Sequence, residues 1–321
     1  MEYVLVTGYA GYIGSHICKS LKQQGYGVIG VDRCTPEDWN TYAQYVDHQY
    51  QWDYNDVRTF HALTKHSVKQ VIHTAATSLV APSVTDPETY YINNVESMRV
   101  FLTLCKQAGV ERVVYSSSAA VYGDGHAVFD ESIVPNPISP YGRTKMVGEW
   151  IIEDYCRAYG MSAVALRYFN VCGADLKGEF GQRSRPTHII SVGISRALRS
   201  ESITINGDDF DTPDGTCERD YVHVMDVAQA NVAALAAEID VFAAVNVGTG
   251  TGYSNLQIVE SINEYTNHLL PFNVGAARPG DPARLVSDNS RAKEILNWQP
   301  KHSDLETIVR SAAAWHERNS V

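Results

Sequence analysis

The stretch VTGYAGYIGSH, residues 6–16, places three glycines between a short apolar run and a helical pattern. Gly8 allows the sharp turn after the run YVLVT, which is typical of a buried parallel strand. Gly11 lets the backbone approach a pyrophosphate closely, and Gly14 lets the following helix pack on the strand. The first N–H groups of that helix attract phosphate groups. The stretch therefore predicts a dinucleotide-binding turn, with a glycine-rich turn that binds no ligand as the alternative.

The next strand, GVIGVD at residues 27–32, ends in a carboxylate that bears on the choice of dinucleotide. Asp32 can bond the adenosine ribose hydroxyls and repel a 2′-phosphate, which favours NAD over NADP. Arg33 acts in the opposite sense, because an adjacent guanidinium can hold a phosphate. Asp53 follows a third expected strand, where it could reach the adenine edge or could simply form a turn.

Beyond this stretch, strand and helix patterns alternate through the first half of the chain. Further strands are expected in KQVIHTAA (69–76), ERVVYSSS (111–118) and SAVALRYFN (162–170). Repeated strand–helix units predict an α/β fold, a Rossmann-type doubly wound parallel sheet covered by helices on both faces. The helix after the first turn should run from about residue 13 to 24. The next long one should begin at Asp86 and Pro87 and end at Gly109.

The pattern becomes less regular after Asn170, which predicts a smaller C-terminal α/β substrate lobe. We expect an NAD-binding domain over residues 1–169, with segments near 222–250 returning to it, and a sugar-nucleotide lobe over 170–321. The run GTGTG (248–252) could be a second phosphate loop, but a turn leading into the helix capped by SNLQ (254–257) explains it better.

Composition narrows the function class. The chain has 321 residues, of which 44% are hydrophobic and 20% charged, with a net charge of −11. These values suit a soluble enzyme and argue against a nucleic-acid binder, which needs a basic surface. The six cysteines form no C-x-x-C pair, so no metal site is expected. No secretory signal or membrane-spanning run is visible, so we expect a cytoplasmic protein without membrane contact.

The stretch SPYGRTK, residues 139–145, places Tyr141 and Lys145 one turn apart on one helix face. The two residues could be an ordinary pair on the surface of a helix, or they could act together in proton transfer. A free tyrosine has a pKa of about 10, and lowering it to about 7 requires roughly 4 kcal/mol of differential stabilisation. The Lys145 ammonium and the positive nicotinamide ring could supply it. Ser118, at the end of its strand, could bond the same substrate oxygen and relay its proton.

These motifs together resemble the extended short-chain dehydrogenase/reductase family. The G-x-x-G-x-x-G spacing, SSSAAVYG (116–123), SPYGRTK and LRYFNVCGA (166–174) carry the resemblance. The runs GDDFDTPDGTCERDYVHVMD (207–226) and ARPGDPARLVSD (277–288) are similar to those of its UDP-hexose 4-epimerases. The likeness runs from the first strand to about Trp298. It implies NAD as cofactor and inversion of a sugar C4 hydroxyl through hydride removal, rotation of a 4-keto intermediate and hydride return.

The resemblance also implies roles for individual residues. It makes Tyr141, Lys145 and Ser118 the catalytic trio. The residues implied to bind NAD are Gly8, Gly11, Tyr12, Ile13, Gly14, Asp32, Arg33, Asp53, Tyr54, Ala75, Ala76, Ser78, Asn93, Ser116, Tyr141, Lys145 and Tyr168. Those implied to bind the UDP-sugar are Ser118, Tyr141, Asn170, His188, Ile189, Thr204, Asn206, Arg219, Arg278, Asp281 and Leu285.

Within the UDP-sugar set, the resemblance implies that Arg219, Arg278 and Asn170 hold the diphosphate. It also implies that Asp281 contacts a ribose. His188 and Ile189 are implied to frame the uracil. Leu285 stands where some relatives carry a tyrosine that narrows the sugar pocket, so 2-N-acetyl sugars could also fit, although simple core packing would explain it equally. Three residues depart from the family pattern in the cofactor region: Tyr9, Arg33 and Ser78.

Other functions of the same fold are alternatives to C4 epimerisation. A 4,6-dehydratase needs an acid–base pair directly after the serine position, where this chain has Ala119 and Ala120. A decarboxylase or reductase of the same family is a further alternative. A non-catalytic NAD-sensing protein is less consistent with the Tyr–Lys pair. The resemblance also implies a homodimer in which helices at about 87–108 and 141–159 of two subunits form a four-helix bundle.

Overall fold

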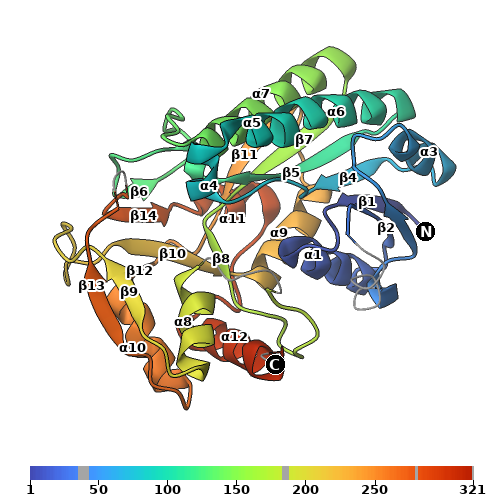
Figure 1. The fold of residues 1–321 in the computed structure, drawn as a ribbon. Helices are drawn as coiled ribbons and strands as arrows, with labels where there is room; N and C mark the ends of the chain where they lie inside the picture. Colours follow the sequence, from blue (N-terminus) through green and yellow to red (C-terminus); the bar gives the residue numbers. More distant parts are fainter. Residues whose placement is uncertain (35–42, 183–187, 279–280, 320–321) are drawn as a thin grey trace.

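The computed structural model of the chain describes residues 1–34, 43–182, 188–278 and 281–319 (Figure 1). Within them, seven strands form one sheet in the order β11-β7-β5-β4-β1-β2-β3, and every neighbouring pair is parallel. The strands are β1 (Tyr3–Thr7), β2 (Gly27–Asp32), β3 (His48–Gln51), β4 (Gln70–His73), β5 (Arg112–Ser118), β7 (Ser162–Tyr168) and β11 (Phe242–Val247). The chain passes β1, β2 and β3 toward one edge and then returns to β4 on the other side of β1, as the prediction of a Rossmann-type sheet requires.

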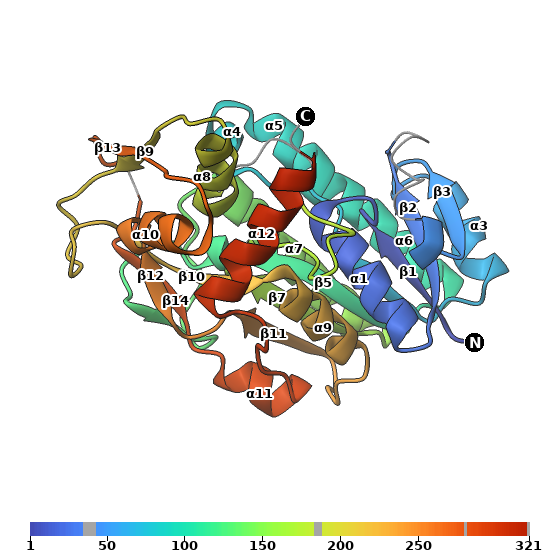
Figure 2. The same ribbon diagram turned by 90° about the horizontal axis from the view of Figure 1, so that it is seen from below.

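Helices cover both faces of this sheet (Figures 1 and 2). One face packs against α1 (Tyr12–Gln23) and α9 (Val224–Leu235), and the other against α3 (Arg58–Lys65), α6 (Ser97–Ala108) and α7 (Pro140–Tyr159). Along β1, Val4 and Val6 enter the first core while Leu5 enters the second. Because successive strand side chains point to opposite faces, a continuous apolar strand is the pattern that a sheet buried on both sides needs.

The helix predicted from Asp86 to Gly109 has the expected ends but is not uniform. Asp86 caps α5 (Pro87–Tyr91) by accepting a bond from Thr89 N at 3.3 Å, and Gly109 ends α6 at a φ of 73°. Between α5 and α6 lies a π-helical turn, Ile92–Glu96. Such turns widen a helix locally and are frequent at functional sites. The sequence pattern did not reveal this one.

A second, smaller lobe contains a sheet in the order β12-β10-β14-β6 and a separate β9–β13 pair; β8 pairs with the later part of β10, at Tyr221–His223. Its helices α8, α10 and α12 enclose a core of their own. The elements are β6 (Val128–Phe129), β8 (Asn170–Cys172), α8 (Ile189–Leu198), β9 (Ile203–Asn206), β10 (Glu218–His223), β12 (Gly252–Ser254), α10 (Asn255–Tyr265), β13 (Phe272–Gly275), β14 (Arg284–Ser287) and α12 (Leu305–Asn319).

Several segments cross between the lobes. After β10, the chain returns to the first sheet through α9 and β11, as the run VNVG predicted. In the opposite direction, β6 lies before residue 169 in the chain but pairs with β14. The domain boundary at residue 169 therefore stays a prediction. The remaining helical elements are Ala43–Tyr45, α4 (Val80–Thr85), Ala119–Val121 and α11 (Ser290–Leu296). No helix in the described ranges has both the length and the apolar character needed to cross a membrane.

The two predictions for residues 248–257 are confirmed. Ser254 Oγ accepts from Gln257 N at 3.1 Å while Gln257 Oε1 accepts from Ser254 N at 2.9 Å, which makes a complete capping box. The GTGTG run is a turn whose amides already have partners. Thr249 N and Gly250 N donate to the buried Asp220 carboxylate at 2.8 and 3.0 Å. Those amides are not free to bind a phosphate.

Candidate functional site

The glycine turn forms a cradle at the carboxyl end of β1. Gly8 has a φ of 70°, which side chains rarely adopt, and a Cβ on Gly14 would lie only 2.1 Å from the Gly8 carbonyl oxygen. Gly11 is the N-cap of α1 and provides no side-chain cap. The first N–H groups of α1 are therefore presented beside a backbone that a ligand can approach closely.

Tyr9 shows how the departure from a small residue is accommodated. Its ring is fully buried in the core under the sheet, and a Cβ on Gly30 would lie 2.5 Å from it. Gly30 in β2 therefore makes the space that the Tyr9 ring fills. The tyrosine consequently packs into the protein interior rather than over the cradle.

The acidic residues beside the cradle differ in their partners. Asp32 accepts hydrogen bonds from Ala10 N and Cys34 N, each at 3.2 Å, so it braces the glycine turn. Arg33 Nη1 lies 3.6 Å from Asp53 Oδ2, which turns the guanidinium toward Asp53. Asp53 Oδ1 is buried without a hydrogen-bond partner. An unsatisfied buried carboxylate oxygen next to a glycine cradle fits a site for a donor such as an adenine amino group.

Residues after β4 form the next part of the rim. Ala75 N donates to Thr7 Oγ1 at 3.3 Å, and Ser78 is exposed nearby along the chain. Asn93, in the π-helical turn, donates to Thr77 Oγ1 at 2.9 Å, and its carbonyl oxygen accepts from the Tyr54 hydroxyl. Its neighbour Asn94 was missed by sequence reasoning. This buried amide bonds both the N–H and the C=O of Thr77, at 2.8 and 3.0 Å, and so fixes the segment after β4.

The proposed catalytic trio comes together where β5 ends and α7 begins. Ser139 caps α7 by accepting from Gly142 N at 3.1 Å, which sets Tyr141 in the first turn. Tyr141 is 8% exposed, and its hydroxyl is close enough to Ser118 for that side chain to lower its pKa. Lys145 Nζ donates to the Ser116 carbonyl oxygen at 2.7 Å and lies 5.9 Å from the Tyr141 ring centroid. The three side chains therefore share one small region, as predicted.

Burial dominates the electrostatics of the trio. It raises the pKa of Tyr141 to about 12, although the Ser118 side chain acts in the lowering direction. Burial also lowers the pKa of Lys145 to about 7, although the charge of Glu149 acts to raise it. The expected phenol pKa near 7 depends on the positive nicotinamide ring as well as on Lys145, so it stays a prediction. Burial disfavours the charged form of each group and is the largest influence on the pKa of both side chains.

Two buried networks support the trio, and neither was found from the sequence. In the first, Glu149 accepts from Arg167 Nη2 at 2.7 Å and from Ser117 Oγ at 2.5 Å. In the second, the hydroxyl of Tyr168 bonds Ser116 Oγ at 3.0 Å and Asn231 Oδ1 at 2.9 Å. Both fix the end of β5, because Ser116 and Ser117 directly precede Ser118. The i+4 spacing of Glu149 from Lys145 was the signal available in the sequence.

The proposed diphosphate residues lie on the second lobe. Arg219, on β10, donates from Nη2 to Asp281 Oδ1 at 2.6 Å and from Nη1 to the carbonyl oxygens of Glu218 and Pro282 at 2.7 and 2.8 Å. Arg278 donates from Nε and Nη2 to the Asn206 side-chain oxygen at 3.3 and 3.1 Å once that amide is oriented to accept. Two arginines are thus aimed by neighbouring acceptors rather than left as mobile chains.

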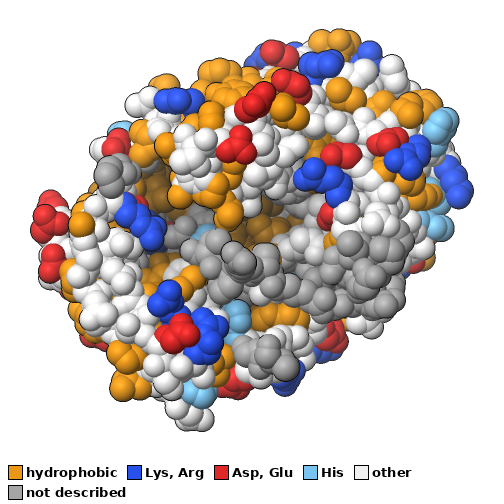
Figure 3. Space-filling model, in the orientation of Figure 1, with side chains coloured by type: hydrophobic (Ala, Val, Ile, Leu, Met, Phe, Trp, Pro, Cys, Tyr) orange, Lys and Arg blue, Asp and Glu red, His pale blue; other side chains and the backbone are white. Residues whose placement is uncertain are grey.

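The other proposed substrate residues also lie on the second lobe. Asn170 on β8 pairs with Tyr221 on β10, and Leu285 on β14 pairs with Arg219. Thr204 is exposed on β9, while His188 and Ile189 stand at the start of α8. Pro279 and Gly280, inside the run 277–288, lie outside the described residues. The space-filling view shows this face hollowed between the lobes, with Lys/Arg and hydrophobic side chains at the edge (Figure 3).

Leu285 is partly buried against a small cluster that includes Phe169, Ala119 and Val121. Ala119 and Val121 of this cluster come just after Ser118 along the chain. Leu285 therefore takes part in packing and also lies close to the catalytic region, which agrees with both interpretations of its position. No group of histidine, cysteine, aspartate or glutamate in the described ranges has an arrangement that could hold a metal ion.

A doubly wound parallel sheet, a glycine cradle and a buried Tyr–Lys pair at the carboxyl end of that sheet define a Rossmann-type nucleotide-binding protein. The NAD dependent epimerase/dehydratase family model matches residues 4–248. The chain belongs to this family.

Individual relatives extend the match over nearly the whole chain. The UDP-glucose 4-epimerase of Rhizobium meliloti is 39% identical and covers 99% of this chain and 98% of its own. A crystal structure of UDP-glucose 4-epimerase from Brucella ovis with NAD gives a TM-score of 0.92 at 40% identity, covering 98% of both chains. A Stenotrophomonas maltophila UDP-glucose-4-epimerase, with NAD and formylated UDP-arabinopyranose, gives 0.95 at 34% identity over 100% of this chain and 99% of that one.

Proposed function

We propose that the chain inverts the C4 hydroxyl of a UDP-hexose and so interconverts UDP-glucose and UDP-galactose, with NAD as its cofactor. The observation that carries this function is that Ser118, Tyr141 and Lys145 lie together at the carboxyl ends of the strands. The glycine cradle lies at the same end of the sheet. The relatives named above are UDP-glucose 4-epimerases over their full length, two of them with NAD. The Ala119–Ala120 pair after Ser118 offers no acid or base for dehydration.

In this proposal, Tyr141 removes the proton from the sugar 4-hydroxyl and Ser118 relays it. NAD supplies, when bound, an acceptor that takes and returns the C4 hydride and a positive charge that favours the phenolate. The protein by itself holds the pKa of Tyr141 at about 12, so Tyr141 is a base only with a cation beside it. Lys145 is anchored through Ser116 and supplies part of that charge when protonated. The 4-keto sugar rotates in the pocket before hydride returns to its other face.

The cofactor contacts are proposed for the first lobe. The glycine cradle and the first turn of α1 would hold the pyrophosphate, and Asp32 the adenosine ribose. The free oxygen of Asp53 supports an adenine contact. The pairing of Arg33 with Asp53 supports NAD over NADP, because it draws the guanidinium into an ion pair.

The substrate contacts are proposed for the second lobe. Arg219, Arg278 and Asn170 would bind the diphosphate, Asp281 a ribose, and the start of α8 the uracil. Charge-assisted bonds hold such a diphosphate firmly. Firm holding of the nucleotide allows the sugar itself to be held loosely enough to turn over. Partly buried Leu285 supports a pocket that also admits 2-N-acetyl sugars, which comparison of turnover on UDP-glucose and UDP-N-acetylglucosamine would test.

We further propose a homodimer formed through α5, α6 and α7. Large apolar side chains stay exposed there, including Ile92 at 44% and Trp150 at 54%. Exposed apolar groups on adjacent long helices support pairing as a four-helix bundle. Light scattering of the purified protein would measure whether it is a dimer in solution. Free thiols stand at Cys18, Cys105, Cys156, Cys172 and Cys217, which supports the cytoplasm as the location.

The function is tested by incubating the purified protein with UDP-galactose, without added cofactor, and following the sugar by NMR. UDP-glucose should accumulate toward equilibrium, because NAD is regenerated in each turnover. A 4-keto or pentose product would instead indicate one of the alternative reactions.

Replacing Tyr141 by Phe removes the proposed base while keeping the ring. Turnover should fall about 10³-fold, within the range that general bases contribute. NAD content, measured by chromatography of the denatured protein, should stay at the wild-type level. Activity close to wild type would reject the assignment of Tyr141.

A further inference from the structure

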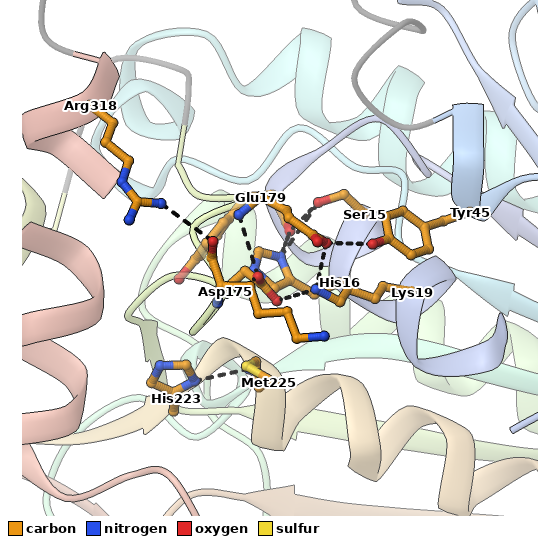
Figure 4. A network of polar contacts seen from close by, with 11 residues as sticks. Ser15, His16, Lys19, Tyr45, Asp175, Glu179, His223, Met225 and Arg318 are labelled. Carbon is orange, nitrogen blue, oxygen red and sulfur yellow. Dashed lines mark hydrogen bonds and ion pairs between the residues drawn. The ribbon is translucent and has the colours of Figure 1, made fainter. Parts of the chain in front are cut away.

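The flank of α1 is joined to the loop that leads into the second lobe, at a distance from the reacting groups. Lys19 reaches across from α1, with Nζ 2.7 Å from Asp175 Oδ2 and 2.6 Å from Glu179 Oε2 (Figure 4). Lys19 and Asp175 are 5% and 2% exposed. A buried lysine held by two carboxylates has few other orientations available.

The neighbours of this ion pair hold it from several sides. The Tyr45 hydroxyl donates to Glu179, and the rings of Tyr45 and Phe180 lie 5.6 and 5.7 Å from Lys19 Nζ. The Asp175 carboxylate also accepts from the loop amides of Lys177 and Glu179, at 3.0 and 3.4 Å. The carboxylates that meet Lys19 are therefore themselves fixed within the loop.

Two further contacts join the same face of α1 to the same loop. The Tyr12 hydroxyl donates to the Gly173 carbonyl oxygen at 2.6 Å, and the His16 ring packs edge-on against Phe180. Tyr12, His16 and Lys19 are four and three residues apart, so they lie on one helix face. The connection therefore extends from the first turn of α1, which carries the proposed pyrophosphate site, to its third.

The ion pair stays charged at neutral pH. Burial disfavours the Lys19 ammonium, but its hydrogen bonds to Asp175 and Glu179 raise its pKa overall. The bond from Lys19 lowers the pKa of Glu179, and the same lysine outweighs the effect of burial to lower that of Asp175. A buried ion pair rarely makes a protein more stable than apolar packing of the same volume would. The contribution to folding stability therefore does not explain why Lys19 is paired here.

The loop that Lys19 holds follows directly after a strand that begins with a proposed substrate residue. Asn170 is the first residue of β8 (Asn170–Cys172), and Gly173, Asp175 and Glu179 follow this strand. We propose that Lys19 is a positioning residue that couples the two binding sites: it fixes the segment that follows the proposed diphosphate contact Asn170 to the helix that carries the proposed site of the cofactor pyrophosphate. This rests on the proposed function, since it assumes that NAD and a UDP-sugar bind at these places.

Coupling of this kind has a measurable signature. If UDP and NAD are bound to segments that Lys19 joins, UDP should raise the affinity for NAD, and NAD should raise the affinity for UDP by the same factor. A slower release of NAD in the presence of UDP is the kinetic sign of this coupling. Couplings between sites are typically about 5–150-fold. A residue with only a structural role would change stability without changing this factor.

The experiment measures NAD release from the purified holoprotein, with and without saturating UDP, for wild type and for Lys19→Met. UDP should slow NAD release from wild type at least about fivefold, and the slowing should fall toward onefold in the variant. Lys22→Met is the matched control on the same helix, because Lys22 pairs with Asp47 near the surface, at 2.8 Å. Its slowing factor should equal that of wild type.

Glu179→Gln is a milder variant for use if Lys19→Met does not fold, because it removes one of the two carboxylates and leaves Asp175 in place. It should reduce the slowing factor partially. An unchanged factor in a folded variant, or wild-type NAD release that does not respond to UDP, would overturn the proposal. Wild-type protein that binds both nucleotides but does not epimerise UDP-galactose would reject the proposed function alone.

Discussion

The glycine turn at residues 6–16 and the arginine site around β10 build their proposed ligand contacts in opposite ways. The turn uses consecutive residues and mostly backbone groups, with Gly14 packed against Gly8. The arginine site uses side chains from β8, β9, β10 and the segment before β14. The first is fixed by local sterics, whereas the second depends on tertiary packing of distant segments.

This difference has consequences for substitution. A cradle made of backbone tolerates no added atom, but it needs no particular side-chain charge. A site made of guanidinium groups tolerates small shifts of packing, but it loses affinity when one charge is removed. The catalytic trio lies between these cases, since Tyr141 and Lys145 are local to one helix while Ser118 comes from another strand.

The largest effect is expected for Gly14→Ala. The new methyl group would lie 2.1 Å from the Gly8 carbonyl oxygen, so α1 must move away from β1. We expect a loss of about 3 kcal/mol in unfolding free energy, together with loss of NAD from the purified protein. Urea unfolding and cofactor content measure the two effects. Gly25→Ala, at the other end of the helix where a Cβ meets no atom within 4 Å, should retain NAD.

Arg219→Met tests the side-chain site. It removes a proposed diphosphate contact and leaves Asp281 without its 2.6 Å partner. The expected cost is about 1.5–3 kcal/mol of binding, seen as a higher KM for the UDP-sugar with NAD content unchanged. Arg284→Met, which removes the neighbouring pair with Glu218, is the control and should leave KM near wild type. An equal rise of KM in both variants would contradict the assignment of Arg219.

Lys145→Met should abolish turnover yet stabilise the NAD-free protein. Burial lowers the pKa of Lys145 from 10.5 to about 7, so the folded state binds the proton less tightly than the unfolded state. Between these values the unfolded state holds more protons, and wild-type stability rises with pH. The variant should therefore be more stable by about 2 kcal/mol near pH 6, with a gain that fades toward pH 10. Unfolding in urea across this range measures it, and a gain independent of pH would contradict the lowered pKa.

The smallest effect is expected for Ser254→Ala in the second lobe. It removes the capping box of α10, in which Ser254 and Gln257 bond each other's backbone N–H groups. A lost N-cap costs about 1 kcal/mol. Thermal unfolding should show the loss, while KM and NAD content should not change. A change in either would mean that α10 contributes to the substrate site, which would weaken the contrast between the two regions.

Much of the fold was predictable because its signals are local. Apolar runs gave the parallel strands of the first sheet, and capping residues gave the ends of α5, α6 and α10. The π-helical turn at Ile92–Glu96 was missed, because no residue pattern marks a change of helical pitch. The sequence did not identify Glu149, Arg167 and Asn94 as supports of the site. A helix or strand pattern does not show which of its polar residues are buried.

The sequence by itself determined the nucleotide cradle, the order of strands and helices, and the spacing of Tyr141 and Lys145. Each of these follows from steric or hydrogen-bonding rules among residues close in the chain. Only the tertiary structure decided the direction of the pKa shifts, the orientation of Arg219 and the attachment of Lys19 to the loop at Asp175. Burial and ion pairing depend on which distant segments meet, and the chain's local pattern does not specify those meetings.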